Sequence, residues 1–256
     1  MTLSAANTLA ALRRDIASLE AARPVSRTRH HRLDREPAMF CAAGGPLRGA
    51  LHEIAAARES EIAAATGFAL ALAARATSRA VLWTGEDMAC AESGALHGPG
   101  LDLFGLAPER FLAVQAAHPR DVLWTMEEAL RCAAVGAVIG EFRRSGLGLT
   151  ATRRLSLAAA SNHGIALLLR TTPDVEPSAA ATRWVIGAAP SAPHAASHAP
   201  GSPRIEAQLV RNRFGEPGTW TLEWNDDERN FARAPADREP VVQAAFDRPR
   251  RAAAGP

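Results

Sequence analysis

The chain has 256 residues, of which 47% are hydrophobic, and a formal net charge of +2 at pH 7. This length and composition fit one large domain, with or without tails, and the nearly balanced charge excludes a protein that is strongly basic overall. No apolar run approaches the roughly 20 residues of a membrane span, and the N-terminus has no signal-type apolar core.

The three cysteines are odd in number and have no C-x-x-C spacing: Cys41, Cys90 and Cys132. This pattern favours free thiols in a reducing compartment over a disulfide or zinc framework. We therefore expect a cytoplasmic protein with no metal site and no cofactor.

The first 37 residues are predicted to form an N-terminal unit of a helix and a linker. Residues 4–22 read as an amphipathic helix, because its apolar residues recur at helical spacing: Leu9, Leu12, Ile16 and Leu19. Residues 23–37 follow as a basic linker with arginines from Arg23 to Arg35. We interpret the linker as a solvated connection, and the alternative is a nucleic-acid-facing arm.

A strand over 51–55, a short loop and a helix over 62–76 occupy the place of a phosphate-binding loop in a nucleotide-binding α/β domain. The pattern G-x-x-x-x-G-K-[ST] is absent, and the chain has no lysine, so all 29 of its Lys and Arg residues are arginines. Glu59 and Glu61 would repel phosphates by roughly 1–4 kcal/mol per pair. We interpret this stretch as an ordinary helix N-terminus, whose acidic first turn suits the helix dipole.

The continuous apolar run 80–83 is typical of a strand inside a parallel sheet. Helices are predicted at 121–134 and 150–164, and residues 93–110 read as a loop. Further buried strands are predicted at 111–114, 137–140, 165–169 and 182–188. The pattern predicts an α/β fold with a mostly parallel central sheet flanked by helices.

Acidic residues follow two of these strands. Glu86 and Asp87 come after the strand at 80–83, and Glu141 ends the strand at 137–140. Ligands of open α/β sheets bind outside the carboxyl ends of the strands, so such carboxylates could hold a metal or activate water. For residues 84–87 we favour a solvated turn.

The helix at 150–164 is expected to begin at Thr150 as N-cap and to end before Gly164. Its inward residues are expected to be Leu155, Leu157 and Ala158. Arg153 and Arg154 are expected to face outward or toward a neighbour.

The last part of the core is predicted to be a β-hairpin, after a flexible loop over 189–203. Residues 204–211 and 219–224 alternate with period two, and Arg211 and Arg213 lie near the tip. After Phe231, residues 232–256 read as a disordered tail. An apolar island within it either docks on a partner or reflects composition alone: Val241, Val242 and Phe246 are its large residues.

These features resemble the ImuA family, the SulA- and RecA-related proteins of bacterial damage-induced mutagenesis. The resemblance runs from about Gly44 to Asn230. It rests on several passages in the right order: Gly-x-Leu-His-Glu-Ile at 49–54, Leu-Trp-Thr-Met-Glu-Glu-Ala-Leu-Arg at 123–131, Thr-Arg-Arg-Leu-Ser-Leu-Ala-Ala-Ala at 152–160, Ala-Thr-Arg-Trp at 181–184, Leu-Val-Arg-Asn-Arg at 209–213 and Leu-Glu-Trp-Asn at 222–225.

The resemblance implies a RecA-like core over 38–231 with a C-terminal hairpin and a degenerate phosphate-binding loop. Glu86 matches the catalytic glutamate of RecA, and Glu141 lies near the acid of its second ATP motif. The loop glycines, lysine and threonine of RecA fall on Ala56, Glu61, Ile62 and Ala63. Arg211-Asn212-Arg213 resembles a Lys-Asn-Lys stretch that faces the neighbouring subunit's nucleotide in RecA.

The resemblance also implies partners. These are an inactive Y-family-like polymerase relative, ImuB, and through it an error-prone replicative-type polymerase, with RecA as a further associate. Our leading hypothesis is a non-enzymatic adaptor for translesion DNA synthesis in the SOS response, with the tail as the tether. The second hypothesis is a DNA-binding module that uses the hairpin arginines and the N-terminal arm. Arg153 and Arg154 are further candidates for a DNA or subunit interface. The third is a SulA-like inhibitor of cell division.

Overall fold

The computed structural model describes residues 47–143, 147–173, 176–191 and 201–234. The predicted N-terminal helix and basic linker, the predicted tail after Ala234 and most of the loop at 189–203 lie outside these residues. In the described part, no helix is long and apolar enough to cross a membrane.

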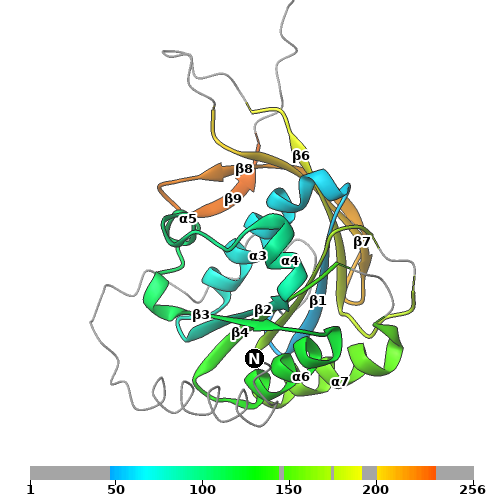
Figure 1. The fold of residues 1–256 in the computed structure, drawn as a ribbon. Helices are drawn as coiled ribbons and strands as arrows, with labels where there is room; N and C mark the ends of the chain where they lie inside the picture. Colours follow the sequence, from blue (N-terminus) through cyan, green and yellow to red (C-terminus); the bar gives the residue numbers. More distant parts are fainter. Residues whose placement is uncertain (1–46, 144–146, 174–175, 192–200, 235–256) are drawn as a thin grey trace, which may run out of the picture.

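One mixed sheet of nine strands forms the centre of the molecule, in the order β3-β2-β4-β5-β1-β6-β7-β8-β9 (Figure 1). The strands from β3 to β6 in this order are parallel, and β7, β8 and β9 continue the sheet as an antiparallel meander. The strands are β1 Ala50–Ala56, β2 Ala80–Glu86, β3 Phe111–Ala116, β4 Val135–Phe142, β5 Ile165–Arg170, β6 Thr182–Ala189, β7 Arg204–Asn212, β8 Gly218–Asn225 and β9 Asn230–Arg233.

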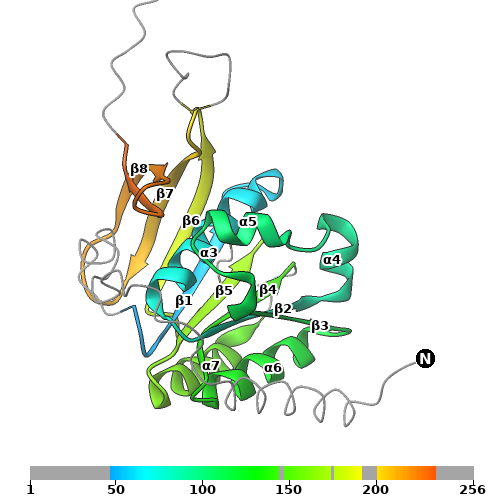
Figure 2. The ribbon, with the colours of Figure 1, turned by 90° about the vertical axis from the view of Figure 1, so that its left-hand side faces the viewer.

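Helices cover the two faces of this sheet, with α3 on one side and α6 and α7 on the other (Figure 2). The helices are α3 Ile62–Ala76, α4 Asp87–Ser93, α5 Gly98–Leu103, α6 Pro119–Arg131 and α7 Gly148–Ser161, with single 3-10 turns at Glu59–Glu61 and Pro108–Arg110. The α/β class, the mostly parallel sheet and the C-terminal hairpin are therefore confirmed. The specific likeness to RecA stays a prediction.

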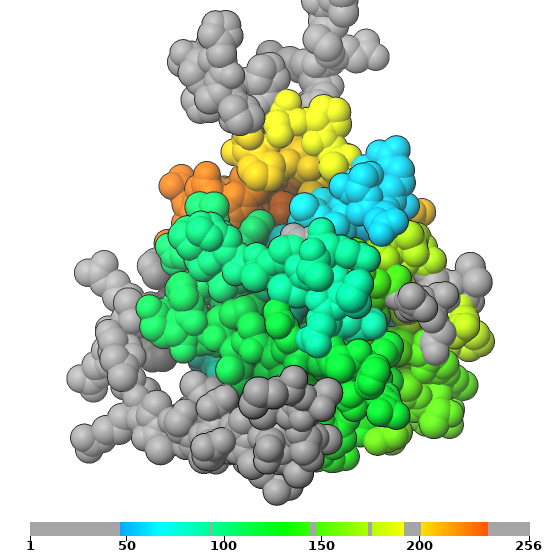
Figure 3. Space-filling view, in the orientation of Figure 1, coloured from blue at the N-terminus to red at the C-terminus, as the bar shows by residue number. Residues whose placement is uncertain are grey.

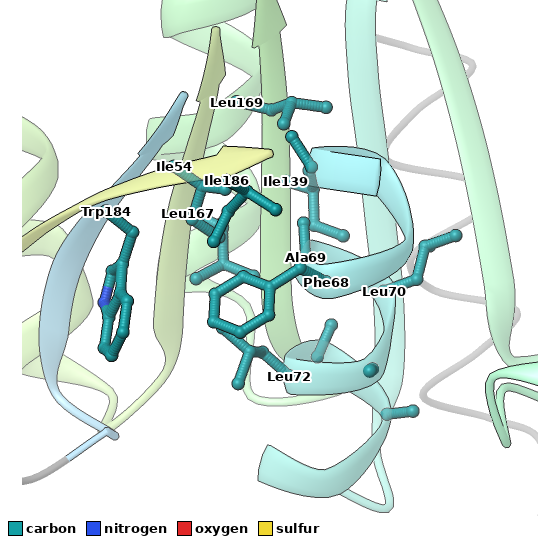
Figure 4. Packing of buried hydrophobic residues seen from close by; sticks show 14 of the residues in the cluster. Ile54, Phe68, Ala69, Leu70, Leu72, Ile139, Leu167, Leu169, Trp184 and Ile186 are labelled. Atoms are coloured by element: carbon teal, nitrogen blue, oxygen red, sulfur yellow. The ribbon is translucent and has the colours of Figure 1, made fainter. Parts of the chain in front are cut away.

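The larger core lies between α3 and the sheet. Phe68 of α3 packs against Trp184 of β6 with ring centroids 5.5 Å apart, and both side chains are fully buried (Figure 4). The alanines of α3 let the helix lie close to the sheet. Gly67 lets the Phe104 ring reach the helix, because a Cβ at Gly67 would lie only 2.7 Å from that ring. The helix is thus buried on most sides, as its apolar sequence predicts.

Several local predictions are wrong, and the sheet explains the first. Residues 84–86 form the end of β2 rather than a solvated turn, because this strand pairs on both sides, with β3 and with β4. Thr84 is fully buried there, and α4 begins at Asp87. The region predicted as a loop at 93–110 contains α5 and a 3-10 turn.

The bounds of α7 also differ from the prediction. The helix begins at Gly148, two residues before the expected N-cap Thr150. Its C′ residue is His163, with a positive φ of 50°, rather than Gly164. Gly164 N donates to Ala159 O at 3.1 Å, which closes a Schellman motif. Leu157 was expected inside and is 66% exposed.

The C-terminal boundary of the core is later than Phe231. Ala232 and Arg233, the first residues of the predicted tail, complete β9 against β8. The N–H of Ala234 donates to the carbonyl of Thr221 at 2.9 Å. The sheet therefore holds the chain as far as Ala234.

Candidate functional site

The connection between β1 and α3 is the place where a nucleotide-binding domain would wrap phosphates. Here the chain leaves β1 after the buried Ala56, and Ala57 N donates to Ile186 O of β6 at 2.8 Å. The connection lies at the surface beside the end of β6, as the light-blue and yellow atoms of Figure 3 show. The N–H of Glu61 donates a hydrogen bond to the carbonyl of Arg58 at 2.8 Å. The connection therefore forms one tight turn, and it contains no glycine.

The Glu61 side chain turns back into this connection. Its carboxylate accepts a hydrogen bond from the Arg58 guanidinium at 2.6 Å and another from the backbone N–H of Ala188. The Arg58 hydrogen bond is the main reason why the pKa of Glu61 lies below its usual range, while burial opposes the shift. An ionised carboxylate thus sits at the start of α3, where the helix dipole favours negative charge.

The next two positions of the predicted loop, Ile62 and Ala63, differ in their burial. Ile62 is partly buried and packs against the core of α3, and Ala63 is exposed. Neither side chain can coordinate a metal or a phosphate. The position that the resemblance assigns to the second loop glycine therefore carries an anion that is already paired, and the lysine position carries the uncharged Ile62.

Glu86 and Glu141 are brought together at the carboxyl ends of β2 and β4. Gly85 pairs with Glu141 across these strands, and one oxygen of Glu86 is buried without a hydrogen-bond partner. Arg143 lies beside them, with its guanidinium 3.8 Å from Glu141 and 2.8 Å from Glu92. Among the described residues, no group of three or more His, Cys, Asp or Glu side chains could hold a metal ion.

Burial raises the pKa of Glu141, and the charge of Glu86 acts in the same direction. The nearby Arg143 and a hydrogen bond from Trp83 oppose this shift without cancelling it. Glu141 therefore favours its protonated form more than an ordinary glutamate does.

All these positions lie along one edge of the sheet, the carboxyl edge of its parallel strands. β4 and β1 are separated by β5, so the carboxyl ends of these two strands are roughly 10 Å apart by strand spacing. The structure thus places the predicted remnants of an ATP site in one region, with arginines paired to carboxylates at both ends of it.

The Arg211-Asn212-Arg213 stretch lies at the opposite edge of the sheet. Asn212 at the end of β7 pairs with Thr182 at the start of β6, on the amino side of the parallel strands. Arg211 donates to the carbonyl of Ser178 at 2.8 Å, and Arg213 N donates to Ala181 O at 2.9 Å. Within one chain, this stretch is therefore not part of the site around Glu61.

The two arginines of α7 have different surroundings. Arg154 donates to Glu127 of α6 at 2.6 Å and joins the two helices. Arg153 is exposed on the outer side of α7. The three apolar tail residues proposed for partner binding, Val241, Val242 and Phe246, lie outside the described residues.

A buried charged cluster was missed by the sequence reading. Glu53 of β1 is 2% exposed and accepts a hydrogen bond from Arg183 of β6 at 2.6 Å. Arg170 at the end of β5 lies 4.0 Å from the same carboxylate. A charged residue inside an otherwise apolar strand, as in Leu-His-Glu-Ile, is the signal that could have revealed this cluster.

No protein-family model matches the chain. Curated relatives do: the chain is 34% identical to protein ImuA from two strains of Caulobacter vibrioides, over 72% of this chain and 78% of each relative. The similarity extends over most of both proteins. The chain therefore belongs to the ImuA family, which the sequence resemblance connects with damage-induced mutagenesis in bacteria.

Proposed function

We propose that this chain is a non-enzymatic accessory protein of error-prone translesion DNA synthesis in the SOS response. It would bind an ImuB-type relative of Y-family polymerases, with RecA as a further partner. Family membership supports the theme of damage-induced mutagenesis. The pairing of Arg58 with Glu61 before α3 is the observation that carries the non-enzymatic part of the proposal.

A phosphate-binding loop needs free backbone N–H groups and a cation at the start of the helix. In this chain the Glu61 carboxylate accepts hydrogen bonds from Arg58 and from the N–H of Ala188. A phosphate at this place would meet an ionised carboxylate within a few ångströms, at a cost of roughly 1–4 kcal/mol per pair. The Glu61 carboxylate thus already occupies the start of α3, where a bound phosphate would have to lie.

The carboxyl edge of β2 and β4 supports the same proposal. An ATPase uses ionised carboxylates there to order magnesium or to activate water. Burial raises the pKa of Glu141, and Arg143 lies between Glu141 and Glu92. The ion pairs of Arg143 with Glu141 and Glu92 favour a structural role for these groups.

The first test is turnover and binding of ATP by the purified protein. We expect no hydrolysis above background and no rise in melting temperature when millimolar Mg-ATP is added, since only a ligand that binds the folded state stabilises it. Hydrolysis that Glu86→Gln abolishes would overturn the non-enzymatic proposal.

The second test is co-purification with the ImuB-type relative. We compare the wild-type chain with a tail variant in which Val241, Val242 and Phe246 are replaced by Asp, and with Arg211→Ala/Arg213→Ala as the control on the core. Loss of capture in the tail variant alone would support the tether. Equal capture by all three would move the partner site to the core, and no capture by the wild-type chain would reject the adaptor role. A truncation used alongside must end after Ala234, because β9 runs to Arg233.

DNA binding is a second candidate, and one observation favours it. Arg213 and Phe214 are both exposed in the turn between β7 and β8, and Phe214 is 44% exposed. An arginine beside an aromatic ring suits single-stranded DNA, which combines phosphates with bases that stack. Affinity for a single-stranded oligonucleotide should then fall steeply with salt and should weaken in Arg213→Ala and Phe214→Ala, while Arg131→Ala on α6 keeps it. Absent or salt-independent binding would remove this candidate.

A further inference from the structure

The surface of α6 and α7 carries two exposed leucines on α7 and two apolar side chains of α6 that pack against the core but are only partly buried. We call it the α6–α7 outer surface, formed by Leu123, Trp124, Leu149, Arg153 and Leu157. Leu149 and Leu157 are 43% and 66% exposed, and Leu123 and Trp124 are only partly buried. Leu149, Arg153 and Leu157 follow one another at intervals of four and share one side of α7. Figures 1 and 2 show the two helices side by side on the same face of the sheet.

An ion pair joins the two helices, and a second one supports it from within α6. Glu127 of α6 is 4% exposed and accepts from Arg154 of α7 at 2.6 Å. Arg131 lies 4.0 Å from the same carboxylate. The surface is therefore a preformed platform, and a segment that docks on it has no need to reorganise it.

The described chain begins on the α3 side of the sheet, where Leu47 is buried and Arg48 donates to Ala76 O, and it reaches the end of α7 at Gly49. Gly49 N donates to Gly164 O at 2.7 Å, just past the end of α7. A Cβ at Gly49 would lie 3.9 Å from the Cα of Ala160, in the last turn of that helix. The contact with α7 is thus made two residues after the first described residue.

We propose that the amphipathic helix predicted at residues 4–22 docks on the α6–α7 outer surface of its own chain. Its stripe of Leu9, Leu12, Ile16 and Leu19 would cover Leu149, Leu157 and Trp124. Asp15 and Glu20 provide carboxylates for Arg153, which lies between the two leucines of α7. A helix of 19 residues is about 28 Å long, and α7 with its 14 residues is about 21 Å long, so the predicted helix is long enough to span α7.

The connecting residues 23–46 allow this arrangement. A fully extended segment of that length spans about 80 Å, far more than the distance along α7 requires. Such a tether keeps the helix at an effective concentration of about millimolar, so a modest apolar contact suffices for docking. The inference does not depend on the proposed adaptor role, since it concerns contacts within one chain.

Hydrogen exchange of the full-length protein, followed by mass spectrometry, tests the proposal. We compare the wild-type chain with Leu157→Arg and with Leu103→Arg as matched control. Leu103 on α5 is 65% exposed, nearly the same as Leu157, and lies away from α6 and α7. We expect the amides of residues 9–19 to be protected in the wild type and in Leu103→Arg. In Leu157→Arg they should exchange about tenfold faster or more, while β1 and β5 keep their protection.

Three results would overturn the proposal. The first is exchange of residues 9–19 at the rate of an unstructured chain in the wild type. The second is protection that Leu157→Arg leaves unchanged. The third is protection that disappears on roughly a hundredfold dilution, since docking within one chain is independent of concentration and docking on a second copy is not.

Discussion

His52 Nε2 donates to the carbonyl of Leu47 at 2.9 Å, and this bond fixes the tautomer of a fully buried imidazole. Because the carbonyl can only accept, Nε2 carries the proton and Nδ1 must accept from the Thr182 hydroxyl, 2.8 Å away. The same hydroxyl accepts from Trp184 Nε1 at 2.9 Å. The network therefore requires the neutral form of His52, and it links the start of β1 to β6.

The first prediction is that acid destabilises the fold through His52. Burial lowers its pKa from 6.5 to about 4, so the unfolded chain takes up a proton at a pH where the folded chain does not. Stability is fully present above pH 6.5 and falls by about 3 kcal/mol as the pH drops to about 4. Urea unfolding of the wild type and of His52→Gln between these pH values measures this change.

The glutamine variant serves as the comparison because its side-chain N–H can still donate to Leu47 but has no charge to acquire. It should start less stable at neutral pH and then lose about 3 kcal/mol less than the wild type. Equal losses in the two proteins would show that His52 does not govern the acid response.

The second prediction concerns the pair of Glu53 and Arg183. Both Glu53 and the neighbouring Arg170 are almost fully buried, so Glu53→Gln leaves buried positive charge without its carboxylate. We expect a loss of about 3–5 kcal/mol in the free energy of unfolding. The matched control is Glu128→Gln, which removes an exposed pair with Arg131 and should cost less than about 1 kcal/mol. A similar, small effect of both substitutions would contradict this reading.

The third prediction concerns Gly136 in β4. A Cβ at this position would overlap the side chain of Thr77, which is buried, β-branched and therefore stiff. Gly136→Ala should cost about 1–3 kcal/mol through overpacking. Gly100→Ala in α5 meets no atom within 4 Å and should be neutral or stabilising by up to about 1 kcal/mol. Thermal unfolding of both variants measures the difference, and a neutral Gly136→Ala would mean that Thr77 can move aside.

Elements with a strong local pattern could be predicted from the sequence. The bounds Ile62–Ala76 of α3 were predicted to the residue, and the alternating β7 and β8 were recognised as a hairpin. The errors arise where tertiary pairing overrides local chemistry. Thr84 and Gly85 read as a turn, yet pairing of β2 with β3 and β4 keeps them in a strand.

The candidate site, like the fold, could be predicted from the sequence only in part. Its position at the carboxyl ends of the strands follows from the α/β pattern, and Glu86 and Glu141 are indeed brought together there. The pairing of Glu61 with Arg58 could not be predicted, because it depends on how the connection folds back onto β6. The prediction that Leu157 is buried is wrong because a helical apolar pattern does not determine which of its leucines pack against the core.

The last prediction concerns the charge of Glu141. Its raised pKa means that ionisation at neutral pH opposes folding, because burial and Glu86 penalise the anion more than Arg143 and Trp83 stabilise it. Glu141→Gln should therefore raise the free energy of unfolding at pH 7. The gain should vanish as the pH falls below the ordinary range of a glutamate, where the wild-type carboxyl is protonated in both the folded and the unfolded chain. Urea unfolding at pH 7 and at pH 4 checks this, and His52 contributes equally to both proteins. A glutamine variant that is less stable at pH 7 would show that the ion pair with Arg143 dominates, and that an ionised Glu141 is a stabilising part of this edge of the sheet.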